Sequence, residues 1–181
     1  MTISTATHYP AQTVFQQPER HTLAILVDNE PGVLARVVGL FSGRGYNIES
    51  LTVAEVDAGG HQSRITLMTT GTRQIIDQIH AQLTRLVPVH KVVDLTESGP
   101  SVERELALIK VNATGMQRVE CLMLAESYRA HVVDTTPDSF IFEITGSTEK
   151  VNAFLRVVEP IGIVELARTG LVGMARGKEK F

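Results

Sequence analysis

The sequence predicts an α+β protein made of two ferredoxin-like units, each with the element order β-α-β-β-α-β. Apolar strand patterns and amphipathic helix patterns follow one another in this order twice along the chain. The stretch Thr96–Pro100 is polar and ends in Gly and Pro, as a linker between two units would. Each unit should form one antiparallel sheet with both helices on one face. The other face then needs cover from the second unit or from another copy of the chain.

The first unit is expected over residues 21–97. Its elements are a strand at 21–27, a helix opened by the turn at 28–32, a strand at 47–56, a return strand at 63–70, a helix that begins at Thr72, and a strand at 89–95. In the first helix Leu34, Val37, Val38 and Phe41 recur at the spacing of one apolar face, and the glycines at 43–45 end it. The second helix repeats that spacing at Ile76, Ile79, Leu83 and Leu86.

The second unit is expected over residues 98–181, with strands at 105–111, 131–135, 139–145 and 161–167. Its first helix has an apolar face marked by Val119, Leu122 and Met123. Its second helix has Val151, Phe154, Leu155 and Val158 on one face and should end at Pro160. The halves also match over two short stretches, TGT at 70–72 with TGS at 145–147, and VVDL at 92–95 with IVEL at 163–166. We interpret these matches as the trace of an old duplication.

Composition and charge exclude several classes of protein. The 181 residues carry a net charge of −3, and neither half has the basic balance of a nucleic-acid binder. Cys121 is the single cysteine, so no intrachain disulfide can form, and it is expected to be a buried small apolar residue. No apolar run reaches the ~18 residues of a membrane span, and the first 20 residues lack the features of a secretory signal. We expect residues 1–20 to be a disordered tail and the protein to be cytoplasmic.

A search for catalytic chemistry yields no constellation. The six histidines do not sit at metal-ligand spacing on one helix face, and Cys121 has no cysteine partner. A catalytic Cys121 working with a distant histidine is an alternative that a single cysteine does not favour. The glycines at 43–45 follow a helix and precede a strand, the reverse of a dinucleotide-binding turn, and the pattern at 173–178 is one residue too short for a phosphate loop. We therefore predict no catalytic residue and no metal site.

The element order also suits an RNA-recognition domain, which stacks bases on aromatic side chains of its central strands. The expected strand at 63–70 contains no aromatic residue. Phe140 and Phe142 could stack on bases, but their neighbour is Glu143 rather than a basic residue. These phenylalanines are interpreted as core residues.

The turn Asp28–Leu34 is the one segment with the features of a ligand site. A helix start offers free backbone N–H groups and the positive end of a dipole to a carboxylate. Gly32 permits close approach to the backbone, Asn29 has a side-chain oxygen that can accept from an ammonium group, and Val33 and Leu34 could contact an aliphatic side chain. Together they suit an apolar α-amino acid. The alternative is purely structural: Asn29 caps the helix, Gly32 serves the turn, and Val33 and Leu34 lie in the core.

The run DNEPGVLAR at 28–36 resembles the opening of an ACT domain, a βαββαβ module that binds small effectors. A longer set of segments resembles the small regulatory subunit of acetohydroxyacid synthase, also called acetolactate synthase. The segments are GLFSGRGYNIESLTV at 39–53, SRITL at 63–67, QLTRLVPV at 82–89, VEREL at 102–106, VVDTTP at 132–137 and ARTGLVGMARG at 167–177. The resemblance covers residues 21–177 and implies an ACT domain at 21–97 followed by a related ferredoxin-like domain at 98–181.

The resemblance also implies a function and a site. Family members form a homodimer through their ACT domains, activate a large catalytic subunit, and confer allosteric feedback inhibition by valine, with leucine or isoleucine as further effectors, in branched-chain amino-acid biosynthesis. The effector is expected at the interface of two chains. One chain would contribute Asn29, Gly32, Val33 and Leu34, and the other would contribute Asn47 and Ile48. Thiamine diphosphate, Mg and FAD are expected on the catalytic subunit and no cofactor in this chain.

Two other functional classes are compatible with the sequence. One is a free-standing amino-acid sensor of the ACT type without an enzyme partner. The sequence has no helix-turn-helix pattern and no basic stretch that would support a sensor acting on gene expression. The other is an enzyme in its own right, such as a small ferredoxin-like phosphatase, which would need Arg and Asn at a glycine-rich phosphate turn. The resemblance favours a non-catalytic regulatory subunit.

Overall fold

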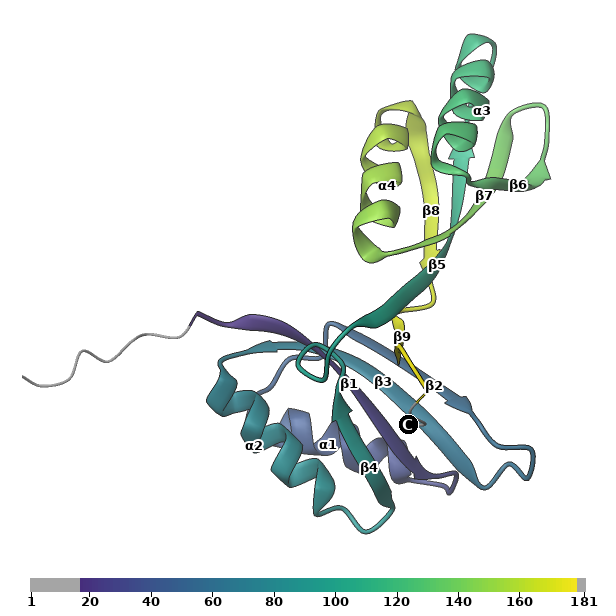
Figure 1. Cartoon of the computed structure of the whole chain (residues 1–181). Helices are drawn as coiled ribbons and strands as arrows, with labels where there is room; N and C mark the ends of the chain where they lie inside the picture. The colour runs from purple at the N-terminus through teal and green to yellow at the C-terminus, as the bar shows by residue number, and fades with distance from the viewer. Residues whose placement is uncertain (1–16, 179–181) are drawn as a thin grey trace, which may run out of the picture.

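The computed structural model describes residues 17–178, which form two lobes (Figure 1). The N-terminal lobe has an antiparallel sheet of order β2-β3-β1-β4, and the C-terminal lobe has a sheet of order β6-β7-β5-β8, in which β5 also pairs with β9. The strands are β1 (Glu19–Asp28), β2 (Ser50–Glu55), β3 (Gln62–Gly71), β4 (Val89–Asp94), β5 (Ser101–Asn112), β6 (His131–Thr135), β7 (Ser139–Gly146), β8 (Ile163–Arg168) and β9 (Val172–Ala175). The helices are α1 (Val33–Arg44), α2 (Arg73–Thr84), α3 (Met116–Tyr128) and α4 (Thr148–Gly162).

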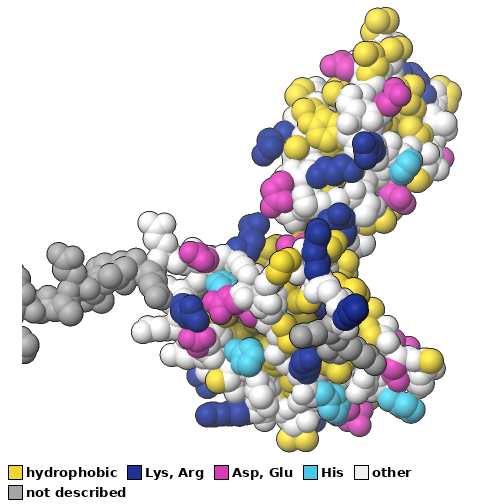
Figure 2. Space-filling view, viewed as in Figure 1, with side chains coloured by type: hydrophobic (Ala, Val, Ile, Leu, Met, Phe, Trp, Pro, Cys, Tyr) yellow, Lys and Arg dark blue, Asp and Glu magenta, His cyan; other side chains and the backbone are white. Residues whose placement is uncertain are grey.

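These elements confirm the predicted fold class of two ferredoxin-like α+β units. Residues 1–16 of the expected tail lie outside the described residues, whereas Glu19 and Arg20 belong to β1. Among the described residues, no helix combines the length and the apolar character needed to cross a membrane. Figure 2 shows the same two lobes with acidic and basic side chains interspersed over the visible face.

In the N-terminal lobe α1 and α2 cover one face of the sheet. The cluster there combines alternate residues of β1 and β3, such as Leu23 and Ile65, with helix residues such as Phe41 and Ile79. All four are at most 1% exposed. Burial of each such side chain contributes about 1.5–3 kcal/mol, so this apolar seam fixes how the helices lie on the sheet.

The C-terminal lobe repeats the arrangement, with Phe142 of β7 and Phe154 of α4 packed edge to face at 6.0 Å. Cys121 and Ala125 of α3 are buried there, as predicted for the cysteine. The predicted apolar face of α3 was wrong, because Val119, Leu122 and Met123 are exposed. Apolar side chains occur on more than one side of this helix, so spacing alone does not identify the side that meets the sheet.

Two boundaries also differ from the prediction. Pro160 does not end α4, which continues to Gly162, where φ of +132° allows the chain to leave the helix. Strand β5 begins at Ser101 rather than at Glu105, because its first four residues pair with β9, a strand that the sequence pattern did not reveal.

The two lobes share a backbone irregularity that supports their interpretation as related units. Strand β1 pairs with β4 with a register shift between Leu26 and Val27. Strand β5 pairs with β8 with a register shift between Lys110 and Val111. These are corresponding strands of the two units, and each shift omits one residue of the partner strand, since pairing passes from Lys91 to Val89 and from Glu165 to Ile163. A bulge at one corresponding place is a conserved feature more often than a coincidence.

Candidate functional site

The turn between β1 and α1 presents an open helix start. Gly32 precedes α1 with φ of +87°, a left-handed conformation that favours glycine. The first bond of the helix ladder runs from the Arg36 amide to the Gly32 carbonyl at 3.0 Å. The amides of Leu34 and Ala35 therefore lie before the ladder begins, at the end of the helix that attracts an anion. Val33 is buried in the core at 3% exposure, while Leu34 is 40% exposed.

Asn29 fastens this turn to the hairpin between β2 and β3. Its side-chain nitrogen donates to Glu55 Oε1 and to the Gly60 carbonyl, both at 2.9 Å, and its backbone N–H donates to the His61 carbonyl at 2.8 Å. Asn29 is therefore not the helix cap of the structural alternative, because Gly32 occupies the N-cap position and no side chain caps the helix there. Both side-chain bonds use the nitrogen, and the oxygen is the atom of this amide that can accept from an ammonium group.

One further contact holds the turn itself, and another stabilises the hairpin to which the turn is tied. Asp28 Oδ1 lies 2.6 Å from Nε2 of His90 on β4, which is 62 residues away. At the β2–β3 hairpin, Asp57 accepts from the backbone N–H of Gln62 at 2.7 Å and of His61 at 3.3 Å. These N–H groups, with that of Gln62 foremost, hold the pKa of the Asp57 carboxyl below its ordinary value of 3.8.

Asn47 and Ile48 lie elsewhere in the chain, just before β2 begins. The Asn47 carbonyl accepts from Thr69 Oγ1 at 2.6 Å, and the Asn47 side chain belongs to an exposed residue. Ile48 is partly buried against the N-terminal core. Because Asn29 is bound to Glu55, the last residue of β2, the two groups of predicted residues lie at opposite ends of a six-residue strand. At about 3.3 Å per residue their separation is about 20 Å, so one chain does not bring all six residues together.

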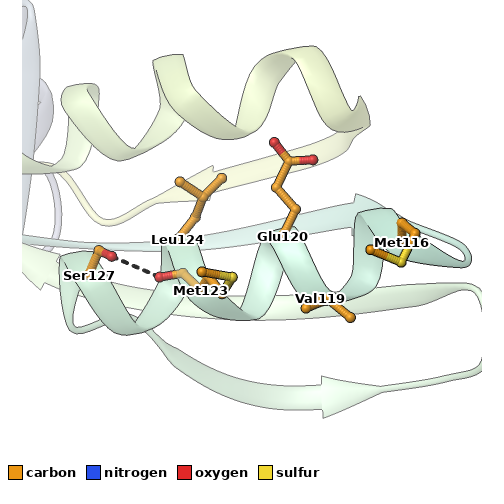
Figure 3. A pocket seen from close by; sticks show the side chains of 6 residues that line it. All are labelled: Met116, Val119, Glu120, Met123, Leu124 and Ser127. Atoms are coloured by element: carbon orange, nitrogen blue, oxygen red, sulfur yellow. Dashed lines mark hydrogen bonds between the residues drawn. The ribbon is translucent and has the colours of Figure 1, made fainter.

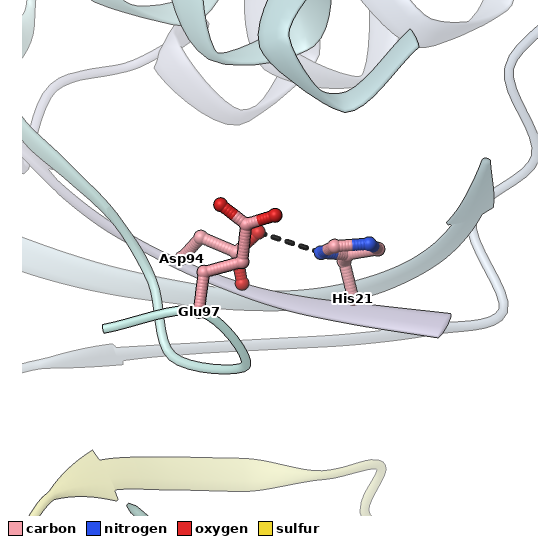
Figure 4. A group of neighbouring side chains, drawn as sticks. All are labelled: His21, Asp94 and Glu97. Atoms are coloured by element: carbon pink, nitrogen blue, oxygen red, sulfur yellow. Dashed lines mark hydrogen bonds and ion pairs between the residues drawn. The ribbon is translucent and has the colours of Figure 1, made fainter. Parts of the chain in front are cut away.

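One group of side chains in the described part of the chain has the composition of a cation site. The potential ligand atoms of His21, Asp94 and Glu97 all lie within 4.8 Å of one another (Figure 4). Each member of the cluster already has a polar partner. His21 Nδ1 lies 2.7 Å from Asp94 Oδ2, the Thr96 amide donates to Asp94 Oδ1 at 2.9 Å, and Glu97 Oε2 lies 3.8 Å from Arg73 Nη2. These bonds account for the cluster as the attachment of the interlobe linker to β1 and β4. Spacing within one helix could not have indicated it, since 73 residues separate His21 from Asp94.

The exposed side of α3 forms a shallow apolar hollow lined by Met116, Val119, Glu120, Met123, Leu124 and Ser127 (Figure 3). In Figure 2 apolar side chains gather over this part of the C-terminal lobe. Met116 is 81% exposed and Met123 is 65% exposed. The hollow contains one carboxylate and no cationic residue, so it offers nothing to a ligand carboxylate.

Comparison with known proteins gives the same family at every level. Residues 23–91 match the model of the acetohydroxyacid synthase small subunit-like ACT domain, and residues 104–177 match that of the small subunit of acetolactate synthase. A probable acetolactate synthase small subunit of Archaeoglobus fulgidus is 49% identical over 161 residues, covering 89% of this chain and 99% of that one. The isozyme 3 small subunit of Escherichia coli is 44% identical over 159 residues, covering 87% and 96%. The crystal structure of the Thermotoga maritima acetolactate synthase small subunit matches with a TM-score of 0.81 and 39% identity, covering 89% and 99%.

Proposed function

The chain belongs to the family of acetolactate synthase small subunits, and we propose that it activates the catalytic subunit and makes it sensitive to valine. In this proposal the chain carries no catalytic residue and no cofactor of its own. Thiamine diphosphate, Mg and FAD belong to the catalytic subunit. Leucine and isoleucine are the further effectors, and the site is formed between two copies of the chain.

The contact that carries this proposal is the hydrogen bond from Asn29 to Glu55, which ties the turn to the end of β2. Strand β2 is an edge strand with β3 as its neighbour in the sheet, and Val53 on it is 41% exposed. An exposed edge with apolar side chains favours pairing with another strand. If two copies pair through β2 about a two-fold axis, the strands run antiparallel, and the start of one lies beside the end of the other.

That pairing would place Asn47 and Ile48 of a second copy beside Asn29 and Leu34 of the first. The chemistry of the joined groups fits an apolar α-amino acid. The open amides of α1 next to Gly32 would hold the carboxylate, and the side-chain oxygens of Asn29 and Asn47 would accept from the ammonium group. The exposed Leu34 and the partner's Ile48 would contact the aliphatic side chain.

Regulation follows if valine binds more tightly to one arrangement of the dimer than to another. The bridging ligand would then favour that arrangement and, through it, a less active state of the catalytic subunit. The effect cannot exceed the difference in valine affinity between the two states, which for coupled sites is about 1–3 kcal/mol.

A mixed dimer tests the proposal sharply. Asn29→Ala and Asn47→Ala should each abolish valine binding and valine inhibition in the homodimer while activation of the catalytic subunit is retained. A dimer with one chain of each variant has one interface site with both asparagines intact and one site with neither. Isolated with two affinity tags, it should recover half of the wild-type valine stoichiometry in a calorimetric titration.

The outcomes separate the parts of the proposal. Full valine sensitivity in both homodimeric variants would show that the site residues are wrong. Mixed dimers that form but bind no valine would contradict a site shared between chains. Wild-type chain that does not raise the activity of the catalytic subunit would contradict the function itself.

A further inference from the structure

Residues 169–175, here called the C-terminal strap, cross the N-terminal sheet after the chain has left the C-terminal lobe. Thr52 Oγ1 on β2 donates to the Leu171 carbonyl at 3.0 Å, and the Leu171 amide donates to Ser50 Oγ at 2.8 Å. Gly170 has φ of +84°, and a Cβ there would lie 2.9 Å from Ser50 Oγ. The strap is therefore fastened to β2 by two side-chain hydroxyls and approaches it at a position that requires glycine.

The strap lies on the face of the sheet opposite α1 and α2. Ser50 and Thr52 alternate with Leu51, which packs into the core under the helices, so their side chains point to the other face. Figure 1 shows β9 on that side of the sheet. Further along, the Gly173 carbonyl accepts from Arg64 Nη2 at 2.6 Å, and Leu171 is 3% exposed. Burial lowers the pKa of the Arg64 guanidinium from its ordinary value. The strap thus provides the cover that the open sheet face needs.

The strap continues directly into the C-terminal sheet. Its first residue follows β8, and β9 pairs with β5 from Ser101 to Arg104. From Glu105 onward β5 pairs with β7, and from Ala107 with β8 as well. Side-chain hydrogen bonds thus join β2 to the strap, and backbone pairing joins the strap to β5, so a continuous hydrogen-bonded path connects β2 with the C-terminal sheet.

We propose that the C-terminal strap transmits effector occupancy at the β2 edge to the C-terminal lobe, and through it to the catalytic subunit. The inference rests on the proposed function, since it takes the start of β2 as one side of the effector site. Ser50 and Thr52 are positioning residues in this scheme: they hold the strap and do not contact the effector. Cutting their bonds should separate valine binding from valine inhibition.

The test uses the double variant Ser50→Ala/Thr52→Val, which removes the two hydroxyls with little change in volume. Its matched control is Thr136→Val/Ser139→Ala, which removes a hydroxyl pair bonded at 2.8 Å between the turn after β6 and the first residue of β7. Both full-length variants are titrated with valine alone and assayed with the catalytic subunit at saturating valine. Hydrogen exchange of the amides at 101–104 and 172–175 is followed with and without valine.

We expect the strap variant to bind valine within about two-fold of wild type. Coupled sites commonly change each other's affinity about 5- to 150-fold. In the strap variant, the ratio between valine affinity with and without the catalytic subunit should fall toward one. Maximal inhibition should be lost, and valine should no longer slow exchange at 172–175, while the control behaves as wild type. Gly170→Ala should give the same uncoupling, with Gly177→Ala, at φ of +106° and with no heavy atom within 4 Å of an added Cβ, as its control.

Three results would overturn the proposal. Equal inhibition of wild type and strap variant, with wild-type valine binding in both, would show that the signal bypasses the strap while leaving the proposed function intact. Equal loss of coupling in the control would show a general destabilisation instead of transmission. A wild-type complex that valine does not inhibit would remove the proposed function and the strap's role with it.

Discussion

We expect Gly32→Ala to leave the fold intact and to weaken valine binding at least about tenfold. An added Cβ would meet no heavy atom within 4 Å, so the substitution causes no clash in the chain itself. With φ of +87° it places an L-residue in the left-handed region, which costs about 1–2 kcal/mol. Loss of glycine's freedom in the unfolded chain offsets about 0.4–1 kcal/mol of this cost. The free energy of unfolding should therefore fall by about 1 kcal/mol, which lowers Tm by about 2–4 °C at this chain length.

Gly45→Ala is the matched control, because Gly45 lies at the other end of α1 with φ of +71° and has equally open space around it. Thermal unfolding should show the same decrease in Tm for both variants. Only Gly32→Ala places a methyl group at the open amides where the effector carboxylate is proposed to bind. A hydrogen bond to a charged group contributes about 1.5–3 kcal/mol, so calorimetry should show valine Kd raised about 10- to 150-fold for this variant alone. Unchanged and equal valine affinities in the two variants, with equal loss of Tm, would refute the placement of the carboxylate at Gly32.

Three further predictions concern the fold around the site. Burial raises the pKa of the Cys121 thiol. The folded protein should therefore react with a thiol reagent at pH 7.5 far more slowly than the urea-unfolded chain. Equal rates for the two would contradict a buried thiol. Phe154→Ala should lower the free energy of unfolding by about 3–5 kcal/mol, because this ring is 0% exposed. Met123→Ala changes a residue that is 65% exposed and should alter the free energy of unfolding by less than about 0.5 kcal/mol. Denaturant titration measures both changes, and similar losses in the two variants would contradict the placement of α3. The lowered pKa of Asp57 means that its carboxylate stabilises the folded state above its ordinary pKa of 3.8 and loses this effect as pH falls through the folded value. The stability difference between wild type and Asp57→Ala should therefore be present at pH 7 and shrink below about pH 4, and a difference independent of pH would contradict the hydrogen bonds from Gln62 and His61.

Most of the fold could be predicted because its signals are local. Alternation of apolar residues reports a strand with one buried face, and the three- and four-residue spacing in α2 and α4 reports a helix face, without any knowledge of the partner. Strand β9 carried no such signal, since it is four residues long and its environment is supplied by β5 and by a sheet more than one hundred residues earlier in the chain. The prediction of the apolar face of α3 was wrong for a related reason. Whether Cys121 or Met123 is buried depends on which side of the helix packs against the C-terminal sheet.

The candidate site was predicted in two unequal parts. The role of Gly32 in the turn and the open helix start were predicted from local chemistry, because a Gly follows a Pro at the end of an apolar strand. The positive φ at Gly32 and its place at the N-cap came only with the structure. The tether from Asn29 to Glu55 depends on a hairpin 26 residues away and could not be derived from the turn. The pairing of this turn with Asn47 and Ile48 came from resemblance to the family, and because one chain holds them at opposite ends of β2, it stays a prediction about two chains.

The strap has a consequence for how the chain is made. A ribosome completes every residue of the N-terminal unit before it synthesises residues 169–175, and the bond between Thr52 and Leu171 spans 119 positions. Domains generally fold from the N-terminus during translation, so the nascent first unit must persist with one face of its sheet uncovered while the second unit emerges. Final closure of that face is thus a late event in biogenesis, and a chain released before residue 169 would keep the uncovered sheet permanently.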